Sequence, residues 1–150
     1  MAFLLERIRQ VANAGVDWIQ IREKDLSGFE LSELAREALA CVPSSCRILV
    51  NDRLDVAIAA GTAGVHLGEK SIFAKDARRF AIERVAPREF QIGASVHSPE
   101  EAQAAEAVGL DYVIFGPVFP TPSKLAFGPP QGLERQEAKG SGAWLRLQVS

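Results

Sequence analysis

The feature that most constrains the fold is the alternation of two kinds of segment along the chain. Stretches with apolar residues at helical spacing, such as 3–14 and 74–84, are separated by short runs rich in β-branched and aromatic residues. The connections are short, which is typical of parallel β-α-β units. We therefore predict an α/β fold with about five parallel strands, at 16–21, 47–50, 63–67, 90–94 and 111–115.

Local signals mark where several helices begin and end. Ser27 and Glu30 have the spacing of a capping box at the start of a helix. Ser98 is placed to cap a helix whose first turn contains Pro99. Gly61 is placed to end a short helix over 54–60.

The position of the polar residues favours a barrel over a doubly wound sheet. They cluster directly after each predicted strand, and in a (β/α)₈ barrel all such positions meet at one rim. A complete barrel needs about 250 residues, whereas this chain has 150. We therefore predict a partial (β/α)₈ barrel domain over 1–134.

The last stretch of the sequence departs from this rhythm. Residues 139–142 read as a linker, and 144–149 alternate in polarity like an edge strand. We expect 135–150 to be a divergent C-terminal tail. A barrel missing strands has open sheet edges, which invite aggregation or pairing with a second copy of the chain.

Composition excludes several classes of protein. The residues are 47% hydrophobic, and the net charge is −2, so there is no basic excess for binding nucleic acid. No apolar run approaches the roughly 18 residues of a membrane span, and the N-terminus does not resemble a signal peptide. Cys41 and Cys46 are expected to be reduced thiols, which fits a cytoplasmic protein.

The end of the first strand carries candidate phosphate ligands. Gln20, Arg22 and Lys24 alternate, so a strand would direct all three side chains to one side. Arginine binds a phosphate through two hydrogen bonds and lysine acts as a point charge. The alternative is a solvated turn in which Glu23 and Asp25 pair with the cations.

Asn51 and Asp52 follow the second strand. An amide suits a phosphate oxygen, and a carboxylate suits Mg²⁺. The alternative is an ordinary turn and helix cap. His66, at the end of the third strand, is interpreted as a packed, hydrogen-bonded core residue rather than a catalytic one.

The fourth and fifth strands lead into further polar loops. Ser95 precedes a helix N-terminus suited to an anion, and His97 is either a group that titrates near neutral pH or a surface imidazole. The proline-rich loop after residue 115 places Thr121, Ser123 and Lys124 for a phosphate, or acts as a mobile lid. Together these residues indicate an anionic substrate, with a diphosphate as the best fit.

Five motifs, read in order, resemble those of thiamine-phosphate synthases and of the thiazole tautomerases in the same superfamily. The likeness runs from about Leu5 to Glu134. The motifs are Gln20-Ile-Arg-Glu-Lys-Asp25, Val50-Asn-Asp-Arg53, Gly64-Val-His-Leu-Gly68, Ile92-Gly-Ala-Ser-Val-His-Ser98 and Gly116-Pro-Val-Phe-Pro-Thr-Pro-Ser-Lys124.

The resemblance implies a (β/α)₈ barrel that joins an aminopyrimidine methyl diphosphate to a thiazole phosphate and releases pyrophosphate, with Mg²⁺ as cofactor. It implies that the C–O bond breaks early and that preset cations stabilise the departing pyrophosphate. The implied pyrophosphate ligands are Arg22, Lys24, Asn51 and Lys124, the metal ligand is Asp52, and Ser95 lies beside the reacting centre. Gln20 is assigned to the pyrimidine, and Thr121 and Ser123 to the thiazole.

Three departures from the family pattern leave alternatives open. Ser71 stands where a second magnesium carboxylate is expected, and Glu69 would have to act from a shifted position. The sequence motif around His97 also occurs among the tautomerases, where a histidine moves a proton on a thiazole carboxylate. The family's first strand and everything after its sixth are absent, so the chain is also readable as a truncated, inactive remnant that binds phosphate.

Overall fold

The computed structural model of the chain describes residues 2–68, 70–84, 89–116 and 146–149. In these residues helices and strands alternate along the chain. The elements are α1 (Ala2–Asn13), β1 (Trp18–Ile21), α2 (Gly28–Cys41), β2 (Arg47–Asn51), α3 (Leu54–Ala60), β3 (Gly64–Leu67), α4 (Ala74–Arg84), β4 (Gln91–Val96), α5 (Pro99–Ala107), β5 (Tyr112–Phe115) and β6 (Arg146–Val149).

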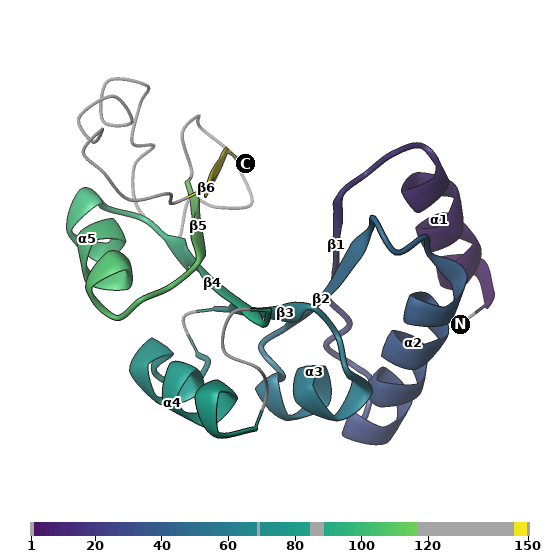
Figure 1. Ribbon diagram of the computed structural model, residues 1–150, viewed down its shortest axis with the longest axis horizontal. Helices are drawn as coiled ribbons and strands as arrows, with labels where there is room; N and C mark the ends of the chain where they lie inside the picture. Colours follow the sequence, from purple (N-terminus) through teal and green to yellow (C-terminus); the bar gives the residue numbers. More distant parts are fainter. Residues whose placement is uncertain (1, 69, 85–88, 117–145, 150) are drawn as a thin grey trace.

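The strands form one sheet in the order β1-β2-β3-β4-β5-β6, and every neighbouring pair is parallel. The sheet curves, and the helices lie along its convex side, so that the concave side is the interior of an incomplete barrel (Figure 1). This confirms the predicted α/β half-barrel. The edge strand expected over 144–149 is also present, as β6, which pairs with β5.

Alternation of side chains along each strand separates two faces. One face packs against the helices and forms the apolar core, and its buried residues include Ile48, Val50, Val65, Leu67, Ile92 and Val113. Leu34 and Ala38 of α2 belong to the same core. The burial of this face fixes the register, because a slip by one residue would expose every one of these side chains.

The opposite, concave face carries the polar positions. The register places Asn51, His66, Gly93 and Tyr112 in one row across four neighbouring strands. Gly93 leaves room in this row, because a Cβ atom there would lie 2.0 Å from Cζ of Tyr112. The concave face is therefore shaped by the missing side chain at this position.

The predicted helix ends are confirmed. Ser27 and Glu30 form a capping box at the start of α2. Ser98 caps α5, whose first turn contains Pro99. Gly61 ends α3 in a left-handed conformation with φ of 72°.

Cys41 and Cys46 are free thiols, as the sequence predicts. None of the described helices has the length and apolar character that crossing a bilayer requires.

The packing of α2 predicts that substitutions at two of its positions differ greatly in their effect on the free energy of unfolding. Leu34 is fully buried and Phe29 is 76% exposed. We expect Leu34→Ala to lower the free energy of unfolding by about 2–5 kcal/mol, because it leaves a cavity. Phe29→Ala, the control on the same helix, is expected to change it by about 0.5 kcal/mol or less. Urea denaturation followed by circular dichroism measures both values, and equal losses would contradict this account of the core.

Candidate active site at the carboxyl ends of the strands

Three predicted ligands form a hydrogen-bonded chain where β1 and β2 end. The Gln20 amide donates to Oδ1 of Asn51 at 2.6 Å, and the Asn51 amide donates to Oδ2 of Asp52 at 2.6 Å. These bonds fix which end of the Asn51 amide is nitrogen. Since an amide nitrogen has two hydrogens, one N–H of Asn51 is left for a ligand.

Asp52 has an unusual backbone conformation, and residues that follow β3 hold its carboxylate. Its φ is 62°, in the left-handed region that few residues other than glycine adopt. Its Oδ1 accepts hydrogen bonds from the backbone N–H of Gly68, at 2.9 Å, and from the Ser71 hydroxyl. The carboxylate is thereby fixed at the rim.

Ser71 supplies a donor where the family pattern has a carboxylate. Its hydroxyl donates to Asp52 and accepts the Gly68 N–H at 2.9 Å. A hydroxyl used in this way orients the carboxylate of Asp52 and adds no negative charge for a cation.

The side chains at this site can bind Mg²⁺ only together with other ligands. In the described part of the chain, no group of three or more His, Cys, Asp or Glu side chains is placed to hold a metal ion. Asp52 offers one carboxylate, and Mg²⁺ commonly binds one or two carboxylates together with substrate phosphates and water. These residues therefore suit an ion that arrives with a phosphate, rather than a metal held by the protein alone.

A second cluster lies on the concave face, between β3 and β5. His66 is 3% exposed, and its Nε2 lies 2.9 Å from Oγ of Ser95. Its Nδ1 lies 3.1 Å from the hydroxyl of Tyr112, which is 5% exposed. His66 is therefore the buried, hydrogen-bonded residue that the sequence predicts, and it also contacts the predicted site residue Ser95.

The surroundings of His66 keep it neutral. Burial lowers the pKa of its imidazole to about 4, the negative charge of Asp52 opposes this shift, and the positive charge of Arg22 adds to it. Burial also raises the pKa of Tyr112 well above its usual value. Both groups are thus uncharged at neutral pH.

Arg22 and Lys24 are exposed residues beyond the end of β1. The strand ends at Ile21, so the alternation that the sequence suggested for these two cations is not imposed by strand geometry. Arg22 lies close enough to His66 to affect its pKa, which places it near the concave cluster.

His97 follows β4, and its ring Nδ1 bonds to the carbonyl oxygen of Gly116, the residue directly after β5. Its backbone N–H donates to Glu101 of α5 at 2.6 Å. The predicted site residues Glu69, Thr121, Ser123 and Lys124 lie outside the described residues.

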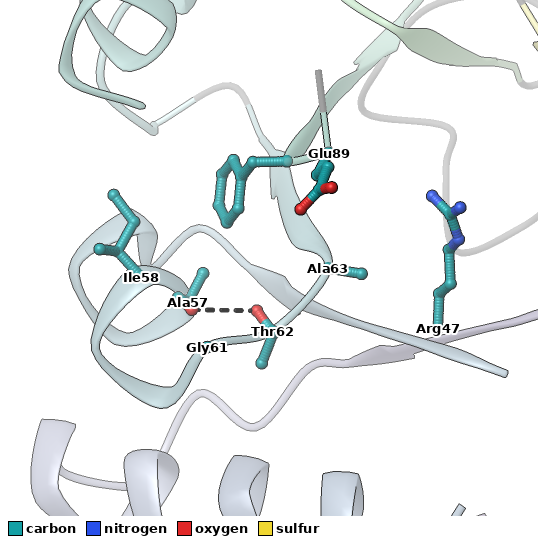
Figure 2. A pocket seen from close by; sticks show the side chains of 8 residues that line it. Arg47, Ala57, Ile58, Gly61, Thr62, Ala63 and Glu89 are labelled. Carbon is teal, nitrogen blue, oxygen red and sulfur yellow. Dashed lines mark hydrogen bonds between the residues drawn. The ribbon is translucent and has the colours of Figure 1, made fainter. Parts of the chain in front are cut away.

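A pocket of about 470 Å³ lies at the opposite, amino end of the strands (Figure 2). Arg47, Thr62 and Glu89 contribute its polar side chains. The Thr62 hydroxyl is already bonded to the carbonyl oxygen of Ala57, at 3.2 Å (Figure 2). This pocket contains none of the predicted site residues and is separate from the candidate site.

Sequence reasoning missed Tyr112. Its signal was the glycine at position 93, within an apolar strand, because an isolated glycine in a strand often marks a close approach by another group. The approaching group is the ring of Tyr112.

The depressed pKa of His66 predicts a pH dependence of stability. Between pH 6.5 and pH 4 the imidazole is protonated in the unfolded chain and neutral in the folded one, so stability falls as the pH falls. We expect His66 to account for a loss of about 3 kcal/mol across this range. Urea denaturation of the wild type and of His66→Gln at both pH values tests this. Equal losses in the two proteins would contradict it.

Comparison with known proteins identifies the family to which the chain belongs. The family model for thiamine monophosphate synthase matches residues 2–141. A thiamine-phosphate synthase of Koribacter versatilis is 38% identical over 138 residues, which cover 92% of this chain and 63% of that protein. One of Methanoculleus marisnigri is 45% identical over 128 residues, which cover 83% of this chain and 57% of that protein.

The solved structures agree with the sequence comparison. A thiamine phosphate pyrophosphorylase from Pyrococcus furiosus superposes with a TM-score of 0.77 and 30% identity, over 97% of this chain and 67% of that one. The chain spans about three fifths of the length of the two curated relatives. It belongs to the thiamine monophosphate synthase family.

Proposed function

We propose that this chain carries the pyrophosphate-binding side of a thiamine-phosphate synthase, a transferase that joins an aminopyrimidine methyl diphosphate to a thiazole phosphate. The observation that carries the proposal is the chain of hydrogen bonds from Gln20 through Asn51 to Asp52 at the carboxyl ends of β1 and β2. It sets an amide donor beside a carboxylate at the rim where barrel enzymes bind substrates.

The proposed chemistry breaks the bond between the methylene carbon and the diphosphate oxygen, and the electron pair leaves with pyrophosphate. The thiazole nitrogen then forms the new C–N bond. The chain's own proposed contribution is electrostatic, because cations and hydrogen-bond donors at the rim would stabilise the charge that develops on the leaving group. Arg22, Lys24 and Lys124 supply positive charge, and the free N–H of Asn51 supplies a neutral donor.

Mg²⁺, when bound, would neutralise part of the pyrophosphate charge. Asp52 is the residue proposed to hold it, with pyrophosphate oxygens and water as the other ligands. Ser71, as a donor to Asp52, contributes no negative charge at the position where the family pattern has a second carboxylate. We place the reaction in the cytoplasm, which the free thiols of Cys41 and Cys46 support.

The metal role of Asp52 is tested by calorimetric titration of pyrophosphate with and without Mg²⁺. We expect Asp52→Asn, which retains a residue type tolerated at positive φ, to weaken binding at least tenfold with Mg²⁺ and to have little effect without it. The control is Asp76→Asn on α4, which removes an equal charge away from the site and is expected to leave affinity within about twofold.

Equal affinity with and without Mg²⁺ would remove the metal from the proposal. Binding of a carboxylated thiazole phosphate without Mg²⁺, and none of pyrophosphate, would instead support a thiazole tautomerase that uses His97.

Lys124 is expected to contact the pyrophosphate directly. Lys124→Ala removes a charge-assisted hydrogen bond worth about 1.5–3 kcal/mol, so pyrophosphate affinity is expected to fall by more than tenfold in the same titration. Arg9→Ala, which removes an exposed cation of α1, is the charge-matched control. Unchanged affinity in Lys124→Ala would exclude this residue from the site.

A further inference from the structure

The concave face holds three side chains in a continuous hydrogen-bonded row. Tyr112 from β5 meets Nδ1 of His66 from β3 at 3.1 Å, and Nε2 of His66 meets Oγ of Ser95 from β4 at 2.9 Å. Tyr112 and His66 are buried, whereas Ser95 is partly exposed. Ser95 is thus the end of the row that a ligand can reach.

The fold leaves Tyr112 little freedom. Tyr112, Gly93 and His66 are in register on β5, β4 and β3, so the tyrosine reaches the histidine across the strand between them. It does so where Gly93 has no side chain. On another side the ring of Trp18 meets it edge-on, with centroids 5.4 Å apart and planes at 86°. The hydroxyl is therefore presented to His66 by packing.

The positions of the protons follow from which groups already have a hydrogen-bond partner. A neutral imidazole has one N–H donor and one acceptor nitrogen, so one neighbour must donate to it and the other must accept from it. Among the described residues, the one hydrogen bond of the Tyr112 hydroxyl is to His66. If Nδ1 donated to Tyr112, the phenol proton would have no acceptor among the described residues, and a buried donor without an acceptor is costly.

We propose that Tyr112 and His66 are positioning residues that make the Ser95 hydroxyl a hydrogen-bond donor to the substrate. Tyr112 donates to Nδ1, the imidazole proton therefore resides on Nε2, and Nε2 donates to Oγ of Ser95. The hydroxyl hydrogen of Ser95 then points to a group outside the row. With the opposite tautomer, Nε2 would accept that hydrogen and Ser95 would offer only lone pairs.

In this assignment, only the identity of the ligand rests on the proposed function. An oxygen of the pyrophosphate is an acceptor, and a hydroxyl whose hydrogen is free matches it. The low pKa of His66 is consistent with the scheme, because a neutral ring is required. The placement of the protons itself belongs to the free chain.

The test is NMR of the chain labelled with ¹⁵N-histidine, at neutral pH and above, where correlations between ring nitrogens and carbon-bound protons identify the protonated nitrogen. We expect Nε2–H for His66 in the wild type. His97 is an internal reference of the opposite tautomer, because its Nδ1 faces the carbonyl oxygen of Gly116, which can only accept.

Two variants separate positioning from a general effect on structure. Tyr112→Phe keeps the ring and removes the donor, and is expected to move the proton of His66 to Nδ1 in part or entirely. Ser95→Ala removes the other neighbour and is expected to leave the proton on Nε2. The signals of His97 are expected to remain unchanged in both, and circular dichroism checks that each variant is folded.

Nδ1–H in the wild type, or an unchanged tautomer in folded Tyr112→Phe, would overturn the proposal. Should Tyr112→Phe fail to fold, the wild-type spectrum and Ser95→Ala still decide it. The spectra need no ligand, so a failure to bind pyrophosphate, which would count against the proposed function, is distinguishable from a failure of the positioning scheme.

Discussion

The register of the parallel strands is the constraint on which the site depends. Burial of one face against the helices, by residues such as Val50, Val65 and Ile92, permits a single register. The other face is then set without further choice, and Asn51, His66, Gly93 and Tyr112 fall in one row. Apolar packing on the convex side thus determines which polar groups meet on the concave side.

The site divides into a charged part and a neutral part, and Asp52 and His66 are their central residues. Asp52 is oriented by Asn51, the Gly68 N–H and Ser71, all of which are uncharged. Neutral donors fix the direction of a carboxylate without pairing its charge, so the charge remains for a cation. A basic residue in place of Ser71 would have satisfied the same oxygen and removed that capacity.

How far the sequence predicts this structure depends on the range of each interaction. The helices, their caps at Ser27 and Ser98, and the strands were predictable because periodicity and capping act over a few residues. The barrel-like arrangement followed from polar residues placed after each strand.

The contact of Tyr112 with His66 was not predictable, because it joins residues far apart in the sequence and depends on exact register across Gly93. The end of β1 at Ile21, before Arg22, likewise depends on pairing with a distant strand, because the last β1–β2 pair is Ile21 with Val50. Thr121, Ser123 and Lys124 remain predictions, outside the described residues.

The neutral part of the site depends on His66 remaining unprotonated. A bound anion raises the pKa of a nearby histidine, because negative charge favours the protonated ring. Protonation of His66 would make both ring nitrogens donors, and the Tyr112 hydroxyl would have to give up its bond as donor. Burial and the positive charge of Arg22 both lower the pKa of His66 and so oppose this change. Burial is the largest of the causes that act on His66, so its enclosed position on the concave face is the main reason that the ring stays neutral.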